Sequence, residues 1–341
     1  MSSLPILLLI FVISLAVLVK ASDVFTDAAE KLGVAIGLPP FIVGVTIVSV
    51  GTSLPELLSS LFGIFQGASE VVVSNVIGSN IANICLVVGT AAILSAKSLR
   101  VVYNLVSVDL PLFVGSAFLF TLMAWDQTFT RGEALILVIG YIMYLFYILK
   151  SSEEESEVPQ AQAPSKDEDN AEGDIQAEGN KGASVATKSM SSASIFREVL
   201  ILLLSGIFIF LGAQYTIDSL IKLSDLLNIG REIIAVSAVA LGTSLPELMV
   251  TIGAARKGKA EIAIGNVVGS NIFNIFIVMG IPGLITPLPV PDAAVSQGIP
   301  TLISVSLLMF FTVQDNKITI WEGWLFLMLY VWFIGTIFNL I

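Results

Sequence analysis

Long apolar stretches alternate with short polar connections along almost the whole chain. Each stretch is close to the roughly 20 apolar residues that a helix needs to cross the hydrocarbon core of a bilayer. Turns rich in glycine and proline, such as the one from Gly37 to Pro40, separate several of them. The pattern therefore predicts ten membrane-spanning helices, at Leu4–Glu30, Phe41–Phe65, Glu70–Leu94, Leu105–Trp125, Gly132–Leu149, Phe196–Leu227, Ile233–Ala255, Glu261–Leu284, Ala294–Val313 and Ile320–Leu340.

The composition agrees with a membrane protein. Of the 341 residues, 55% are hydrophobic and only 13% are charged, whereas about a quarter of the residues of a soluble domain are charged. The first apolar stretch has no basic segment before it and no small-residue cleavage site after it. We interpret it as a spanning helix and not as a cleaved signal peptide. The predicted fold class is an all-α polytopic membrane protein.

One segment departs from the apolar pattern. Residues Ser151 to Ser194 are rich in Glu, Asp, Ala, Ser, Gln and Gly, and they carry most of the acidic excess behind the net charge of −11. Such a segment cannot bury enough apolar surface to fold alone. We expect an acidic disordered linker at 151–194, between a first five-helix repeat at 1–150 and a second at 195–341. A solvated tether is the simplest role for it, and a cation-collecting or regulatory tail is the alternative.

The two halves of the chain carry the same motifs. Gly51–Glu56 reads Gly-Thr-Ser-Leu-Pro-Glu, and the same six residues recur at Gly242–Glu247, a spacing of 191 positions. A second block, Asn75–Asn83, recurs at Asn266–Asn274 with the same spacing, and about half of the positions from 51 to 89 are identical to those from 242 to 280. Internal repeats of this kind are typical of transporters whose ion and substrate sites lie at the repeat interface.

Basic residues predict the orientation of these repeats. Of the 16 lysines and arginines, all except Arg131, Lys222 and Arg231 fall on one side of the predicted topology. That side is cytoplasmic by the positive-inside rule. The linker is then cytoplasmic and both termini are extracytoplasmic. Because five is an odd number of helices, the two repeats are inverted relative to each other in the cell membrane, as alternating access would require.

Each copy of the hexapeptide places a carboxylate and a proline inside a predicted membrane span. A carboxylate inside a membrane span is costly and is a functional candidate by default. Pro55 has no N–H, so the carbonyl of Gly51 loses its helical partner. We expect the spans to be broken at Gly51–Pro55 and Gly242–Pro246, and their successors at Gly78–Asn80 and Gly269–Asn271.

Residues that flank these breaks supply oxygen atoms in matching positions. In the first half, Thr52 and Glu56 lie four residues apart on one helix face, and so do Ser79 and Asn83 in the next span. Free backbone carbonyls can also face a cavity at such breaks. The expected ligands are Ser49, Thr52, Ser53, Glu56, Ser79 and Asn83 in the first half and Ala240, Thr243, Ser244, Glu247, Ser270 and Asn274 in the second, with Ser49 and Ala240 acting through their carbonyls.

This ligand set indicates the kind of ion. The chain has no histidine, and its single cysteine, Cys85, lies inside an apolar stretch. Oxygen donors alone suit Ca²⁺, Na⁺ and Mg²⁺ and not zinc or copper, and flexible mixed ligands favour Ca²⁺ and Na⁺ over Mg²⁺. A proline kink or a small-residue motif taken alone would usually serve helix packing. The duplication of the whole set favours an ion site.

At these residues the chain resembles the calcium/cation antiporter superfamily, and within it the sodium/calcium exchangers of the smaller prokaryotic type. Gly44–Gly89 and Ala235–Gly280 look like the two α-repeats of that family. The resemblance implies that the second, third, seventh and eighth helices form a core around the ions. It also implies that the long first and sixth helices slide across this core. It also implies that Glu56 and Glu247 are the paired calcium-binding glutamates and that the other residues named above are the family's polar and backbone ligands.

One position departs from the family pattern. Sodium-coupled relatives often carry an aspartate where this chain has Asn274. Two ionised glutamates balance one Ca²⁺, but three Na⁺ would leave a positive charge unmatched in a low-dielectric site. The stoichiometry of exchange is therefore open.

The predicted function is that of a secondary antiporter, not an enzyme, which exchanges Ca²⁺ for Na⁺ across the cell membrane by alternating access. A Ca²⁺/H⁺ antiporter, in which the two glutamates take protons, is the alternative. A passive cation channel and a calcium-binding membrane protein without transport are further alternatives. We expect no cofactor, no nucleic acid and no obligate protein partner, so that the two transported ions and the lipid bilayer are the partners.

Overall fold

The computed structural model describes residues 4–95, 98–101, 103, 109–157, 191–227 and 244–337. Most of them form helices, and the strands are only two residues long. The elements are α1 (Leu4–Ala35), α2 (Pro40–Val43), η1 (Gly44–Val48), α3 (Ser49–Phe65), α4 (Glu70–Ala82), η2 (Asn83–Val88), α5 (Gly89–Leu94), β1 (Leu99–Arg100), α6 (Asp109–Ala124), β2 (Thr128–Phe129), α7 (Arg131–Glu157), α8 (Ser192–Leu227), α10 (Leu245–Arg256), α11 (Ala260–Phe273), η3 (Asn274–Val278), α12 (Gly280–Ile285), β3 (Leu288–Pro289), η4 (Ala294–Gly298), α13 (Ile299–Thr312), η5 (Val313–Asp315), β4 (Lys317–Ile318) and α14 (Ile320–Ile337).

The described helices match the predicted spans closely. Eight of them, with consecutive segments taken together, are long and apolar enough to cross a membrane, and α6 is a shorter apolar helix. The prediction of a polytopic α-helical membrane protein is confirmed. The count of ten spans stays a prediction, because residues 104–108 and 228–243 lie outside the described part of the chain. Of the linker predicted at 151–194, residues 158–190 also lie outside the described part of the chain, whereas 151–157 continue α7 and 192–194 begin α8.

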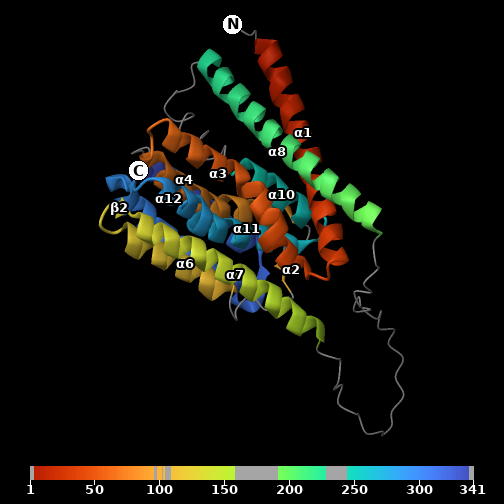
Figure 1. Cartoon of the computed structure of the whole chain (residues 1–341). Coiled ribbons are helices and arrows are strands. Elements are labelled where there is room, and N and C mark those ends of the chain that lie inside the picture. The colour runs from red at the N-terminus through yellow and green to blue at the C-terminus, as the bar shows by residue number, and fades with distance from the viewer. Residues whose placement is uncertain are drawn as a thin grey trace.

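Two long helices form one flank of the molecule. α1 and α8 lie side by side and cross the remaining helices at a slant (Figure 1). With 32 residues, α1 is about 48 Å long, which exceeds the hydrocarbon thickness of roughly 30 Å. Only 22% of the most apolar window of each helix is buried. Most of their apolar surface therefore faces outward, where the bilayer lies.

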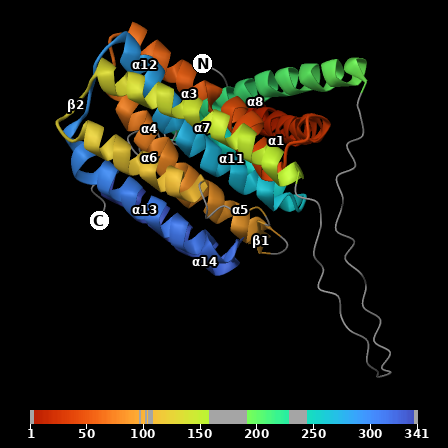
Figure 2. The same cartoon turned by 60° about the horizontal axis from the view of Figure 1, so that its bottom comes forward.

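The interior is formed by α3, α4, α10 and α11. The most apolar window of Ala260–Ile285, which contains α11, is 100% buried. Helices α6 and α7 flank this interior on the side away from α8 (Figure 1), and α13 and α14 lie beside α5 and α6 (Figure 2). The resemblance implied that the second, third and eighth spans are central, and their burial agrees with it.

Glycines let the two halves approach closely at this interior. A Cβ atom at Gly44 would lie 2.7 Å from the carbonyl oxygen of Ile262, and one at Gly269 would collide with the carbonyl oxygen of Val45. Side chains at these positions would push α11 away from η1 and α2. The glycines thus bring α11 of the second half against the helix that carries the first hexapeptide.

The predicted helix breaks are wrong in the first half. α3 is continuous from Ser49 to Phe65 with Pro55 inside it, and α4 is continuous through Gly78–Asn80. α11 likewise runs without a break through Gly269–Asn271. A proline in a membrane helix removes only one backbone hydrogen bond, and neighbouring helices can hold such a helix together.

The irregular backbone lies nearby, in π-helical turns. η1 precedes the hexapeptide helix α3, and η2 and η3 begin at Asn83 and Asn274. Such turns are frequent at functional sites. In the second half, α10 begins at Leu245 with Pro246 in its first turn, where a proline costs no helical hydrogen bond. Residues 241–243 before it lie outside the described residues.

Local structure recurs at the spacing of the sequence repeat. The turns after α3 and α10 both contain a glycine with positive φ, +77° at Gly67 and +75° at Gly258. Asn75 and Asn266 each donate a side-chain hydrogen bond to a hydroxyl 15 residues earlier, at 3.4 and 2.9 Å. The short ladders β1–β4 and β2–β3 each join one half to the other. These features support a structural repeat, and the opposite orientation of its copies stays a prediction.

Candidate cation site

The polar side chains of the first hexapeptide face the interior. Thr52, Ser53 and Glu56 on α3 are at most 1% exposed, and so are Ser244 and Glu247 at the start of α10. Their spacing places them on the face of each helix that packs against the other half. The structure thus brings together the predicted residues that it describes from both hexapeptides. Thr243 and Ala240 lie outside the described residues.

Two contacts join the halves directly. The Ser53 hydroxyl donates to Glu247 Oε1 at 3.0 Å, so the first hexapeptide contacts the carboxylate of the second. Thr52 Oγ1 lies 3.4 Å from Ser270 Oγ of α11. Four of the predicted residues, from α3, α10 and α11, therefore make contacts across the interface between the two halves.

The predicted residues that the structure describes are hereafter called the cluster, and several of their oxygen atoms have no hydrogen-bond partner among the described residues. Both carboxylate oxygens of Glu56 and the Oε2 atom of Glu247 are buried and accept no hydrogen bond from the described residues. Ser244 Oγ, Asn274 Oδ1 and Asn83 Oδ1 are likewise buried without a hydrogen-bond partner, and Asn83 Nδ2 donates no hydrogen bond to the described residues. An unpaired buried polar atom costs about 1–3 kcal/mol, and a charged one costs more. Buried charges are normally paired or coordinate a cation, so this donor set fits a bound cation.

An asparagine outside the predicted set orients Asn274. Asn274 Nδ2 donates to Asn80 Oδ1 at 3.1 Å, and Asn80 Nδ2 donates to the Asn271 carbonyl at 3.2 Å. Because the amide nitrogen of Asn274 is held in this way, its oxygen is the atom left free. Asn274 is therefore presented as an oxygen donor.

A second such residue, Asn266, positions Thr52. The Thr52 hydroxyl lies 3.1 Å from Asn266 Oδ1, and Asn266 Nδ2 donates to Thr251 Oγ1 at 2.9 Å. Asn80, Asn266 and Asn271 all belong to the duplicated second block. The sequence signal that could have identified them is the recurrence of several asparagines at matching positions of the two apolar stretches, and not only of the last one in each copy.

The remaining predicted residues are also buried at this interface. Ser79 and Ser270 are 1% and 0% exposed. The carbonyl oxygen of Ser49 lies 3.2 Å from Thr52 Oγ1, while the Ser49 hydroxyl donates to the Val45 carbonyl of its own helix. The Ser49 carbonyl oxygen thus contacts a predicted ligand, while a Cβ atom at Gly269 of α11 would lie 2.6 Å from the Ser49 hydroxyl oxygen. The role of the Ser49 carbonyl as a ligand stays a prediction.

The charge of the cluster is low for a metal site. Glu56 and Glu247 are its two carboxylates, and its other members are neutral. No group of three or more His, Cys, Asp or Glu side chains suited to a metal occurs among the described residues. Neutral oxygens around two carboxylates are the ligands of a hard, weakly held cation such as Ca²⁺ or Na⁺.

Fold and candidate site together indicate a class of protein: a polytopic membrane protein with two similar halves and a buried cluster of oxygen atoms between them that fits a cation. A model of the family described as "Sodium/calcium exchanger protein" matches residues 6–150 and 197–339. The chain belongs to this family, within the calcium/cation antiporter superfamily, and its family is one of transporters and not of enzymes.

Individual relatives match nearly the whole chain. The sodium/calcium exchanger MaX1 of Methanosarcina acetivorans is 34% identical over 97% of this chain and 98% of its own length. The inner membrane protein YrbG of Escherichia coli is 30% identical over 88% of this chain and 86% of its own. A solved structure of the sodium-calcium exchanger NCX_Mj, soaked with zero Na⁺ and Ca²⁺, has a TM-score of 0.78 at 27% identity and covers 98% of this chain and 100% of that one.

Proposed function

We propose that this chain exchanges Ca²⁺ for Na⁺ across the cell membrane by alternating access, through the site formed by both hexapeptides. The observation that carries the proposal is the group of buried, unpartnered oxygens on Glu56, Glu247, Ser244, Asn83 and Asn274. Membership of the sodium/calcium exchanger family supports the same pair of ions.

The charge of the site explains why transport would be coupled. An empty site holds two carboxylates in a low-dielectric interior, and a buried uncompensated charge is strongly unfavourable. A Ca²⁺ ion neutralises both, and Na⁺ ions can bind to the same oxygens in its place. The occluded state is then reached with either ion bound and not with the site empty, which makes the protein an exchanger and not a channel.

The site residues come from both halves, which suits a site at a repeat interface. We propose that the halves are inverted five-helix repeats, at 1–150 and 195–341, with both termini extracytoplasmic and residues 151–194 as a cytoplasmic linker. The distribution of lysine and arginine supports this orientation. The site then opens in turn to each side of the membrane when α1 and α8 move along it.

A flux experiment tests the coupling. The purified chain is reconstituted in liposomes loaded with Na⁺, and ⁴⁵Ca uptake is measured after dilution into Na⁺-free buffer. We expect uptake driven by the Na⁺ gradient and abolished when K⁺ or choline replaces Na⁺ inside. Uptake that ignores the Na⁺ gradient would remove Na⁺ as the coupling ion.

Proton coupling is the second candidate. The observation that favours it is that both oxygens of Glu56 lack a protein partner and Asn274 adds no third negative charge. A carboxylate buried in this way can be neutralised by a proton instead of Na⁺. ⁴⁵Ca uptake driven by a pH gradient without Na⁺ would support this candidate.

A further inference from the structure

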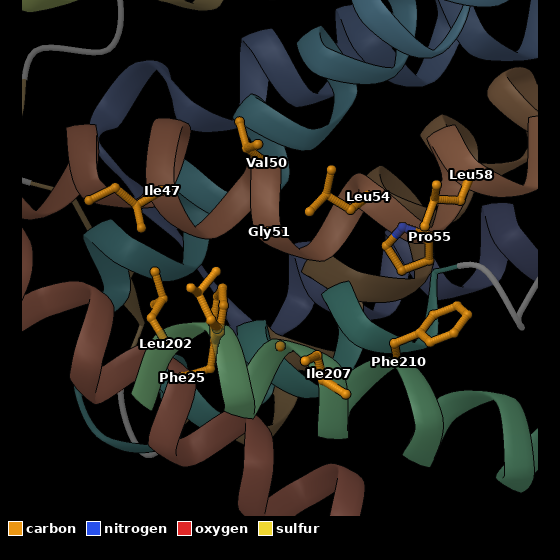
Figure 3. A pocket seen from close by; sticks show the side chains of 12 residues that line it. Phe25, Ile47, Val50, Gly51, Leu54, Pro55, Leu58, Leu202, Ile207 and Phe210 are labelled. Atoms are coloured by element: carbon orange, nitrogen blue, oxygen red, sulfur yellow. The ribbon is translucent and has the colours of Figure 1, made fainter. Parts of the chain in front are cut away.

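An apolar cavity of about 560 Å³ lies between α3, α8 and the Phe25 side chain of α1. Figure 3 shows Leu54 and Pro55 of α3 on one side and Ile207 and Phe210 of α8 on the other. Its volume falls within the range of about 300–1,000 Å³ that is typical of small-molecule sites. The cavity is separate from the candidate cation site described above.

The cavity and the cation site share one helix. Cavity-lining residues of α3, such as Val50, Leu54 and Leu58, recur at a spacing of four, while Thr52, Ser53 and Glu56 lie between them on the opposite face. The cavity therefore lies directly behind the helix that carries the predicted ligands of the first half.

Two glycines create the space. A Cβ atom at Gly51 would collide with the ring of Phe25, and one at Gly206 would lie 3.7 Å from Phe25 Cε2, at ordinary contact distance. Gly51 thus admits the ring, and Gly206 leaves the α8 wall of the cavity without a side chain. A larger side chain at Gly206 would extend into the cavity.

The surroundings identify what can occupy this space. The lining is formed by apolar side chains and glycines, which offer an ion or water no hydrogen bonds. The residues at its mouth are partly exposed on helices long enough to span the membrane: Leu54 is 45% exposed, Ile207 55% and Leu203 61%. The cavity is therefore continuous with the lipid-facing surface, and lipid acyl chains are the molecules that can enter it from there.

We propose that this cavity is a binding site for one acyl chain of a membrane phospholipid. Lipid chains are as apolar as the cavity wall, so an acyl chain gains no hydrophobic free energy when it moves from the bilayer into the cavity. Binding is favoured because a filled cavity regains the dispersion contacts that an empty one lacks. The bound chain then packs between α8 and the back of the ligand-bearing helix α3.

Photo-crosslinking tests the proposal without using transport. The full chain is reconstituted with phosphatidylcholine that carries a diazirine on one acyl chain, and the adducts are mapped by mass spectrometry. We expect adducts at Leu54 and Ile207 in higher yield than at Leu122 of α6, whose side chain is 75% exposed and lies outside the cavity. As the fraction of labelled lipid rises, the yield at the cavity should saturate, whereas the yield at Leu122 rises in proportion.

A matched pair of variants tests the location. Gly206→Leu should lower the yield at Leu54 and Ile207 about fivefold, because a leucine side chain fills the space that the chain would occupy. Gly115→Leu is the control, since Gly115 is on α6 and a Cβ there meets no atom within 4 Å. Equal, non-saturating yields at the cavity and at Leu122 in the unsubstituted protein would overturn the proposal whether or not Gly206→Leu folds. So would a folded Gly206→Leu variant with unchanged yields.

Discussion

Glu56 and Glu247 have the same sequence context and different surroundings. Glu247 Oε1 accepts a hydrogen bond from Ser53 at 3.0 Å, whereas neither oxygen of Glu56 has a partner among the described residues. Both side chains are fully buried. Both should therefore need a cation, and Glu56 should depend on it more.

The first prediction concerns these carboxylates. Glu56→Gln keeps the shape of the side chain and removes a buried negative charge, so the apparent affinity for Ca²⁺ should fall by about 100-fold or more, equivalent to about 3 kcal/mol. Glu247→Gln should have a comparable effect. The measurement is ⁴⁵Ca uptake as a function of Ca²⁺ concentration. The control is Glu133→Gln, which alters an exposed carboxylate at the start of α7. Full activity of the Glu56→Gln variant would show that Glu56 does not belong to the site.

The second prediction concerns the amide pair of Asn80 and Asn274. Asn80→Leu removes the acceptor that holds Asn274 Nδ2, so the amide of Asn274 can rotate and present nitrogen to the ion. The KM for Ca²⁺ should rise about fivefold, as expected for the loss of one hydrogen bond of about 1 kcal/mol, with kcat nearly unchanged.

A double-mutant cycle separates this positioning role from a general loss of structure. In an Asn274→Ala background, Asn80→Leu should have no further effect on KM, because the group through which it acts is gone. Equal effects of Asn80→Leu in the two backgrounds would show that Asn80 does not act through Asn274.

At the scale of elements, one end of α1 is tied to the turn between α10 and α11. Lys259 Nζ lies 2.6 Å from Asp27 Oδ1 and 2.7 Å from Glu30 Oε2, and Lys257 Nζ lies 3.0 Å from Asp27 Oδ2 and 3.2 Å from Asp23 Oδ1. Burial alone would lower the pKa of Lys259, but its hydrogen bonds to Asp27 and Glu30 and their charges raise it above its usual value. The link is thus fully present at neutral pH. It is lost as pH rises through this raised pKa, and it is also lost in acid, where the partner carboxylates become protonated.

The repeat does not duplicate this link. The positions that correspond to Lys257 and Lys259 in the first half are Gln66 and Ala68, which cannot form ion pairs. The turn after α10 therefore holds α1 through its lysines, whereas the corresponding turn after α3 has no lysine that could hold α8 in the same way. If α1 moves along the interior during exchange, these ion pairs must break.

The third prediction follows from this asymmetry. The double variant Lys257→Gln/Lys259→Gln should raise the population in which α1 is separated from the turn by about fivefold, since partly exposed ion pairs contribute about 0–1 kcal/mol each. The measurement is the distance distribution between spin labels at Val34→Cys and Arg256→Cys, with Cys85 replaced by alanine.

Two comparisons complete this test. High salt should act on the wild-type pair in the same direction, because it screens exposed charges. Lys317→Gln, which removes the ion pair to Asp315 in the turn before α14, should leave the distances unchanged. Identical distributions with and without Lys257 and Lys259 would show that the link does not hold α1.

At the scale of the whole molecule, the fourth prediction concerns the inversion of the repeats. Phe65 and Arg256 occupy the same repeat position, 191 residues apart, and both are exposed at the ends of α3 and α10. In a Cys85→Ala background, a membrane-impermeant thiol reagent should label Phe65→Cys from outside the cell and Arg256→Cys only from the cytoplasmic side. Labelling of both from one side would exclude inverted repeats.

Much of this molecule could be predicted from local patterns. Hydropathy located the eight described spans to within a few residues, because the length of a spanning helix is set by the bilayer. The ligand candidates followed from residue type and duplication, and those that are described lie buried between the halves. The predicted break at Gly51–Pro55 was wrong. A proline in the sequence shows that one helical hydrogen bond is missing, but it does not show the packing against neighbouring helices that keeps α3 continuous.

The class of protein, the sequence repeat and the oxygen chemistry of the candidate ligands follow from the amino-acid sequence alone, since each depends on residues close together in the chain or on recurrence at a fixed spacing. Three features appear only in the folded chain: Ser53 contacts Glu247, Asn80 orients the Asn274 amide, and an apolar cavity lies behind the helix that carries the candidate ligands. Each of these depends on atoms that come from helices far apart in sequence. Their positions are set by the close packing of the two halves, which no linear pattern of residues contains.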